Sequence, residues 1–346
     1  MTLVYRRAGL VLKRGSAAAD PLVKALQQDL RKLGYLRSGI DGGFGEGTER
    51  AVRALQFDLL HAVQPGSDGE PPVTLREFNR ERVTSVTGTL DENLAACIED
   101  ILADPRVPTL PRSDDPARAN REALASVQSL VGLRVPRQFL LAILLQESDG
   151  LHFRIPTAAS ADDFIVVGLD RNEQGNPDHI TSRGYGIGQY TLFHHPPRAE
   201  EVETLMLDPV RNVQRAVNEL NKKLERFVNG PTSGQQADDR LAEFGRGELR
   251  RCRFEASDPR FMTDCVRCAA EARVDIGATT PLHPRTTETL HPTEYHHETT
   301  YAGVPDRSKL GCDWPYAVRR YNGSGVNSYH YQYQVLHRLT RPPLTV

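Results

Sequence analysis

One segment of this 346-residue chain restricts the fold more than any other: Phe139–Gln146 reads FLLAILLQ and carries no charge. Leu140, Leu144 and the following Glu147 recur at four- and three-residue spacing, so they share one face of a helix. A helix this apolar packs in a core, which places the Glu147 carboxyl on the core side of the last turn. Burial disfavours the ionised form of a carboxyl group, so we expect a raised pKa and a candidate general acid. Taken alone, the segment favours a partly exposed last-turn residue, but two further segments change this interpretation.

These two segments carry residues that suit contacts with sugars. Gly184–Thr191 reads GYGIGQYT, and its glycines leave the backbone bare enough for close approach of a polymer. Gln189 can hydrogen-bond a hydroxyl or acetamido group, while Tyr185 and Tyr190 offer flat faces to sugar rings. Tyr321–Gly323 adds an aromatic hydroxyl and an amide. Each segment by itself is more commonly a simple turn.

Together the three segments resemble the motifs of the lytic transglycosylase family of the lysozyme-like superfamily. Glu147–Ser148, Gly186–Gln189 and Tyr321–Ser324 match its Glu-Ser pair, its Gly-x-Gly-Gln-like segment and its Tyr-Asn-Ala-Gly-like segment, over about residues 120 to 340. The resemblance implies that Glu147 is the sole catalytic acid/base. It also implies that Gln189, Tyr321 and Asn322 line the site. With them, the candidate substrate-binding residues are Ser148, Tyr185, Gly186 and Tyr190.

The resemblance further implies a reaction. Glu147 protonates the glycosidic oxygen between N-acetylmuramic acid and N-acetylglucosamine, then acts as a base on the muramic 6-hydroxyl, which gives a 1,6-anhydro ring. A goose-type-lysozyme-like muramidase is the alternative, and such hydrolases use a second carboxylate roughly 5 to 9.5 Å away. Asp162, Asp163 and Asp170 are the candidates for it. A non-catalytic cell-wall-binding protein is a third interpretation, against which a buried acid argues.

The chain between the first two motifs has a β pattern. Asp163–Asp170 predicts a strand, and His179–Thr181 predicts a second extended segment after a turn, so we expect a small β-hairpin. Near the C-terminus, Tyr329, Tyr331 and Tyr333 alternate. A helix would spread them around its surface, so we do not assign them to sugar contacts.

The amino-terminal part carries a separate helical signature. Leu22, Leu26 and Leu30 lie at helical spacing before a turn at Gly34. The characteristic positions are Leu26-Gln27, Leu33–Leu36, Asp41–Gly45, Thr48, Ala51-Val52 and Leu55-Gln56. They resemble the small three-helix peptidoglycan-binding module, and Asp41, Gly42 and Phe44 are its candidate contacts. A purely structural helical hairpin is the alternative, since Asp41 also suits a tight turn.

A stretch rich in proline and aspartate, residues 104–116, predicts a break between domains. We therefore expect a mainly α chain with a peptidoglycan-binding module and N-terminal extension at 1–104 and a linker at 105–118. A lysozyme-like α+β catalytic domain then occupies 119–346, with the hairpin and an insertion at about 230–312.

The composition of the chain restricts the kinds of molecule that it could bind. With 43 basic and 45 acidic residues the net charge is -2, which argues against nucleic acid, and no apolar stretch approaches the ~20 residues of a transmembrane helix. Met1–Arg7 lacks the pattern of a signal peptide. We expect a protein made in the cytoplasm that acts on peptidoglycan glycan strands in the periplasm or cell wall, as a phage endolysin or a secreted antibacterial effector. A secretion apparatus and an immunity protein are candidate partners.

Five cysteines divide into two groups. Cys97 lies in the apolar register of a short helix and suits a core, whereas Cys252, Cys265, Cys268 and Cys312 lie in or beside the insertion. Those four are compatible with two disulfides, with a tetrahedral zinc site or with free thiols. Disulfides are favoured over zinc, so no cofactor is expected. Four histidines of the insertion are interpreted as surface residues: His283, His291, His296 and His297.

Overall fold

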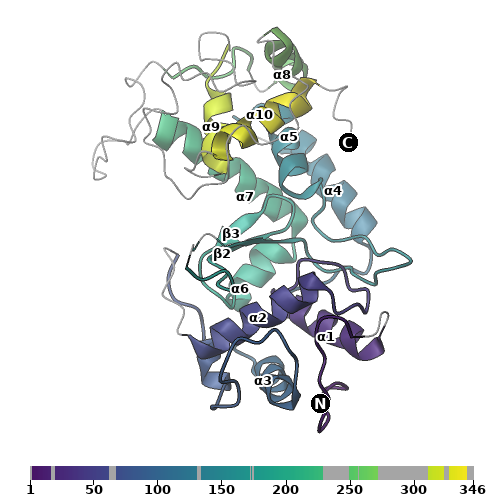
Figure 1. The fold of residues 1–346 in the computed structure, drawn as a ribbon. Coiled ribbons are helices and arrows are strands. Elements are labelled where there is room, and N and C mark those ends of the chain that lie inside the picture. Colours follow the sequence, from purple (N-terminus) through teal and green to yellow (C-terminus); the bar gives the residue numbers. More distant parts are fainter. Residues whose placement is uncertain are drawn as a thin grey trace. The chain divides into compact units, whose positions relative to one another are not determined.

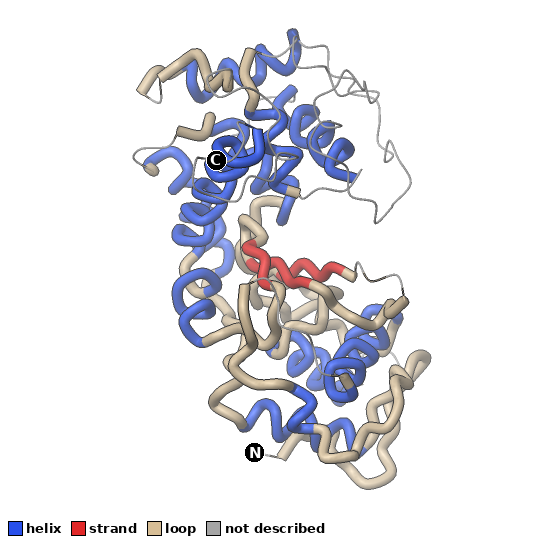
Figure 2. Tube along the Cα trace, turned by 90° about the vertical axis from the view of Figure 1, so that its left-hand side faces the viewer, coloured by secondary structure: helices blue, strands red, loops and turns tan. Residues whose placement is uncertain are grey.

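The computed structural model is mainly helical, with one small sheet (Figures 1 and 2). Contacts between residues divide the chain into two compact units, here named unit 1 and unit 2. Unit 1 comprises Met1–Asn120 and Leu151–Asn212, and unit 2 comprises Arg121–Gly150 and Val213–Val346. The described residues are 2–16, 20–61, 68–130, 134–171, 173, 175–228, 249–255, 257–271, 311–322 and 327–340.

Three helices form the amino-terminal part of unit 1, as the sequence predicts: α1 (Pro21–Lys32), α2 (Glu46–Leu60) and α3 (Glu92–Ala103), with a short 3-10 helix η1 (Leu75–Phe78) between the last two (Figure 1). Asp20 and Asp91 cap α1 and α3 by accepting hydrogen bonds from the backbone N–H groups of Leu22 and Leu94. Each cap satisfies a donor that the first turn of a helix leaves without a partner.

Two buried glutamines organise the loops that join these helices. Gln27 Nε2 donates to Asp41 Oδ1 at 2.9 Å and to Thr48 Oγ1 at 3.0 Å, and its Oε1 accepts from Gly42 N at 2.7 Å. Gln56 does the same for a second loop, because its Oε1 accepts from the backbone N–H groups of both Thr87 and Gly88. In each of the two Leu-Gln pairs of the sequence signature, the leucine therefore packs in the core and the glutamine amide hydrogen-bonds a loop.

The sheet has three antiparallel strands, drawn red in Figure 2: β1 (Val167–Asp170), β2 (Ser182–Tyr185) and β3 (Tyr190–Leu192). A hairpin is therefore present, but both of its strands begin later than predicted, at Val167 rather than Asp163 and at Ser182 rather than His179. The sheet also gains a third strand. The residues before β1 are used elsewhere, since Phe164 forms a bridge with Arg112 and Ile165 forms one with Phe153. Tertiary pairing thus overrides a strand pattern that begins at residue 163.

Unit 1 has a core shared by the three helices and by residues far along the chain. Phe164 and Ile180 belong to the same buried cluster as Leu26 and Leu55. The predicted linker at 105–118 is not an exposed tether, because Leu110 is buried and its N–H donates to Lys32 O at 2.8 Å. The contact-based units thus differ from the predicted domain boundaries, which stay a prediction. Unit 1 also contains α6 (Ala199–Glu201) and the π-helical segment η2 (Val202–Met206).

The regular elements in the described part of unit 2 are all helices. Its α5, α8, α9 and α10 pack together, and Trp314 at the start of α9 is fully buried. The elements that lie wholly within unit 2 are α5 (Arg137–Ser148), the π-helical η3 (Lys223–Val228), α8 (Arg260–Glu271), α9 (Trp314–Tyr321) and α10 (Asn327–Thr340). Two further helices begin in unit 1 and end in unit 2: α4 (Pro116–Ser129) and α7 (Pro209–Lys222). Most of the predicted insertion and its four histidines, like Gly323 and Ser324, lie outside the described residues. Within the described ranges, no helix is long and apolar enough to cross a membrane.

Candidate functional site

The candidate acid lies at the end of α5. Phe139, Leu140 and Ile143 are buried, and Glu147 is partly buried in the last turn, on the helix where the sequence predicts it. Asp149 and Gly150 end the helix with left-handed backbones, at φ values of 55° and 74°. An Asp-Gly pair suits this exit, because both residue types tolerate positive φ better than most.

Tyr331 holds the carboxylate. Its hydroxyl donates to Glu147 Oε1 at 2.5 Å, and its side chain is 7% exposed. Burial raises the pKa of Tyr331 well above its ordinary value, and the nearby charge of Glu147 adds to the effect. The phenol therefore remains a donor at neutral pH. The prediction that the alternating tyrosines lie on the surface of a helix is wrong for Tyr331 and Tyr333, which are buried. The missed signal is four-residue spacing with Val335 and Leu339, which places Tyr331 on a buried face of α10.

Tyr321 also lies close to the acid. Burial raises the pKa of Tyr321 well above its ordinary value, and the charges of Glu147 and Glu219 raise it further. Asn322 is exposed and follows directly as the C-terminal cap of α9. The structure therefore brings Tyr321 into the electrostatic range of Glu147, as the predicted site requires, while Asn322 faces solvent.

The neighbours of Glu147 fix the end of the helix. The Ser148 hydroxyl donates to Leu144 O at 3.0 Å within α5 and is buried. Arg338 of α10 donates through Nε to Gln146 Oε1 at 2.9 Å. The predicted contact residue Ser148 thus has a backbone acceptor inside its own helix, and α10 contacts the last turn of α5 through Tyr331 and Arg338.

The glycine-rich motif lies in unit 1, where it forms the turn between β2 and β3. Gly186 has a φ of 73°, and a Cβ there would lie 2.6 Å from His152 Nδ1 and 2.9 Å from Asn212 Nδ2. Asn212 Oδ1 accepts from Gly188 N at 2.8 Å, and His152 Nδ1 accepts from Ile187 N at 3.3 Å. Burial lowers the pKa of His152 to about 4, which keeps the ring neutral and able to accept. Glycine is required at 186 by both its backbone angle and the close packing.

Gln189 packs over the sheet. Its Nε2 donates to Gly186 O at 2.7 Å. A Cβ added to Gly184 would lie only 2.7 Å from the Gln189 Oε1 atom, which is too close. Gly168 faces Gly184 across the strands and makes room for the same amide. The expectation that these glycines expose backbone to a polymer is therefore not met at Gly184, because the chain itself fills the space.

The two tyrosines of this motif differ in exposure. Tyr185 is fully buried in the core of unit 1, so the predicted stacking face is not available to a ligand, whereas Tyr190 of β3 is partly buried. The predicted site residues are thus divided between units: Glu147, Ser148, Tyr321 and Asn322 in unit 2, and Tyr185, Gly186, Gln189 and Tyr190 in unit 1.

The three candidates for a second carboxylate all have partners within unit 1. Asp162 pairs with Arg31 at 2.7 Å, with both side chains buried. Asp163 accepts two hydrogen bonds from Arg112, at 2.6 and 2.8 Å. Asp170 accepts from the Ser182 hydroxyl at 2.9 Å. Each of the three carboxylates therefore has a structural partner within unit 1.

The predicted contact loop of the amino-terminal part exposes one of its three residues. Asp41 is exposed, Gly42 is buried with a φ of 82°, and Phe44 is 2% exposed within the core. Although burial opposes it, hydrogen bonds from Gln27 and from the backbone N–H of Gly43 lower the pKa of Asp41. Phe44 thus anchors the loop, and Asp41 is the residue that can meet a ligand.

A charged cleft of about 650 Å³ lies along α2 in the same unit. Its walls include Arg50 and Arg53 from α2, with Arg171 and Asp178 from the segment around β1 and β2. Burial lowers the pKa of Arg171, and the neighbouring charges of Arg50 and Arg183 contribute. The walls also include Arg14 and the acidic residues Glu46, Glu49 and Glu173, so four guanidinium groups are matched by four carboxylates. The formal charges that line the cleft therefore balance.

Comparison with protein families identifies part of unit 1. Residues 19–59 match the family model described as a peptidoglycan binding domain. The match includes α1, the Asp41–Gly45 loop and nearly all of α2. No curated protein and no solved structure matches the chain. Residues 19–59 therefore form a peptidoglycan-binding domain, which gives this chain a module for binding the cell wall.

Proposed function

We propose that this chain degrades peptidoglycan, cleaving the β-1,4 bond between N-acetylmuramic acid and N-acetylglucosamine as a lytic transglycosylase. The observation that carries the proposal is the partly buried Glu147 carboxylate, held by the phenol of Tyr331 at the end of an apolar helix. Burial of a carboxyl group is unfavourable without a partner, and a buried tyrosine supplies one here, so the acid is kept at this place by a specific contact. The peptidoglycan-binding domain at residues 19–59 would bind the polymer that such an acid cleaves.

In the proposed reaction Glu147 acts twice. Its protonated form gives a proton to the glycosidic oxygen, and the resulting carboxylate then takes the proton of the muramic 6-hydroxyl as the 1,6-anhydro ring closes. The Tyr331 hydroxyl stabilises and orients the carboxylate between the two steps. One acid/base is sufficient for this route, since no water has to be activated.

The partners of the other carboxylates favour this route over a hydrolase. A lysozyme-type enzyme would need a second acid, and Asp162, Asp163 and Asp170 are each held by an arginine or serine in unit 1. We further propose that the protein acts in the periplasm or cell wall, where its substrate lies, either as an endolysin or as a secreted effector.

The products distinguish the alternatives. Purified sacculi are incubated with the full chain, and the released muropeptides are analysed by mass spectrometry. We expect 1,6-anhydro ends, which are lighter by one water than reducing ends. Reducing ends would instead identify a muramidase, and no release by the folded protein would favour a non-catalytic wall-binding protein.

Replacing Tyr331 by phenylalanine tests the positioning role of its hydroxyl. A hydrogen bond from a phenol favours the ionised carboxylate, so its loss favours the protonated one, and the pH–activity profile should move upward by about one unit. Turbidity loss of sacculi across a pH series measures the shift. Tyr333→Phe is the matched control, because Tyr333 is a fully buried tyrosine of the same helix. Equal profiles for wild type and Tyr331→Phe would contradict the role of Tyr331.

A further inference from the structure

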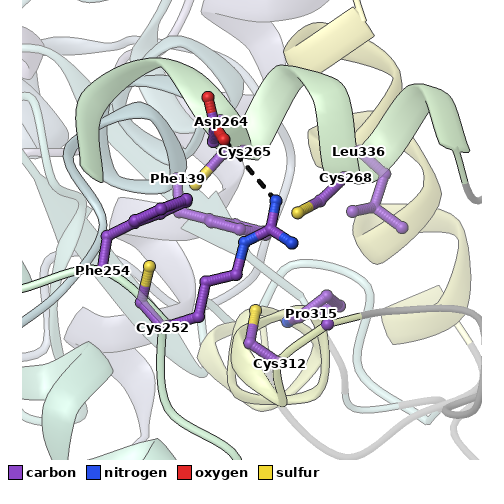
Figure 3. Close-up of a pocket in the computed structure, with 11 residues that line it drawn as sticks. Phe139, Cys252, Phe254, Asp264, Cys265, Cys268, Cys312, Pro315 and Leu336 are labelled. Atoms are coloured by element: carbon purple, nitrogen blue, oxygen red, sulfur yellow. Dashed lines mark ion pairs between the residues drawn. The ribbon is translucent and has the colours of Figure 1, made fainter. Parts of the chain in front are cut away.

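Four thiols from three segments of unit 2 surround one cavity (Figure 3). Cys265 and Cys268 lie in α8, Cys252 precedes this helix, and Cys312 lies just before α9. In Figure 3 the four side chains turn toward the space between them. Segments that are distant in the sequence thus bring their sulfur atoms to one place.

Contacts between the segments hold the thiols there. Arg250 N donates to Asp313 Oδ2 at 2.7 Å, and Asp313 N donates back to Arg250 O at 2.7 Å. Each of these residues is one or two positions from a cysteine of the cluster. Arg253 pairs with Asp264 of α8 at 3.5 Å, shown by the dashed line in Figure 3. The two flanking segments and α8 are therefore joined before any covalent bond is made.

The cavity that the four thiols line is mostly apolar. Phe139, Phe254, Pro315 and Leu336 give the cavity apolar walls. Burial raises the pKa of Cys312 to about 12, and neighbouring thiols add to the effect. Among the described histidine, cysteine and acidic side chains, no group of three is placed to hold a metal ion.

We infer that these cysteines form two disulfides, each joining α8 to one of its flanking segments. Residues three apart in a helix have Cβ atoms about 5–6 Å apart, whereas a disulfide needs about 3.5–4.5 Å. A bond between Cys265 and Cys268 would therefore distort α8. Each of them pairs instead with Cys252 or Cys312. This inference does not depend on the proposed enzymatic activity.

Each bond forms by exchange with a disulfide-bonded oxidant. Two protein thiols give up two electrons and two protons in total, and one S–S bond forms in the chain. The S–S bond of the oxidant breaks, and the oxidant leaves as two thiols. An oxidising extracytoplasmic compartment supplies such oxidants.

The test counts thiols in the full chain. Protein purified under reducing conditions is treated with oxidised glutathione, denatured, alkylated and weighed intact. The reduced protein should take five labels and the oxidised protein one, at Cys97, which lies in unit 1. Peptide mapping should then find α8 linked to Cys252 and to Cys312. The oxidised form should melt about 5 °C or more above the reduced form, and a reductant should reverse the gain.

Cys97→Ser is the matched variant, which should take four labels when reduced and none after oxidation. Five labels after oxidation of the wild-type chain would overturn the inference. So would a Cys265–Cys268 link in the peptide map, or purified protein that carries one zinc ion per chain and resists oxidation until a chelator removes it.

Discussion

Glu147→Gln is expected to lower the rate of wall cleavage by about 10³-fold or more, because one side chain supplies both the acid and the base. Glutamine has nearly the same shape and still offers an oxygen to the Tyr331 hydroxyl, so the end of α5 should keep its structure. It carries no proton that titrates, and neither half of the reaction can proceed through it. Turbidity loss of purified sacculi measures the rate, and thermal melting checks the fold.

Asp149→Asn provides a control two residues away. The Asp149 side chain is 87% exposed, and asparagine tolerates its left-handed backbone. This variant should retain activity close to that of the wild type. If the Glu147→Gln variant cleaved walls at the wild-type rate, Glu147 would have no part in the mechanism. An equal loss in both variants would indicate a general effect of removing charge from this turn.

Asp162→Ala should destabilise unit 1 by about 3–5 kcal/mol, since it leaves a buried arginine without its counter-charge. The Arg31 side chain is 0% exposed and pairs with Asp162 at 2.7 Å. Burial lowers the pKa of Arg31 to about 10, which reflects how unfavourable the isolated cation is. Urea unfolding followed by circular dichroism measures the change in the free energy of unfolding.

The adjacent residue is the matched control. Asp163 pairs with Arg112, whose side chain is 56% exposed, so Asp163→Ala should change the free energy of unfolding by about 1 kcal/mol or less. Replacing both partners of the buried pair, as Arg31→Met with Asp162→Leu, should recover much of the loss. If Asp162→Ala and Asp163→Ala had equal effects, the buried pair would not hold unit 1 together.

The elements that local pattern determines are predictable from the sequence. Leucine spacing and the Leu-Gln pairs predict α1 and α2, and the apolar run before Glu147 predicts α5. The loop at Asp41 is predictable in part, because its carboxylate accepts from the Gly43 N–H two residues further on, a common short-range turn contact. The hydrogen bonds between Gln27 and the same loop join residues 14 and 15 positions apart.

What the sequence does not reveal depends on partners that are distant along the chain. Tyr331 lies 184 positions from Glu147, so nothing near it shows that its hydroxyl meets a carboxylate. Glycine at 184 indicates a need for space, but not that Gln189 fills that space rather than a ligand. The predicted linker likewise looks exposed until Leu110 is seen to be buried.

The division of the chain also bears on its synthesis. Residues 121–150 belong to unit 2, yet they interrupt the two stretches that build unit 1. Domains usually fold as units while the ribosome extends the chain from its N-terminus. Unit 1 is complete only after residue 212 emerges, and the apolar surface of α5 stays uncovered until α8 and α10, which pack against it, are made. The helix that carries Glu147 is therefore exposed on the nascent chain while the intervening residues are synthesised.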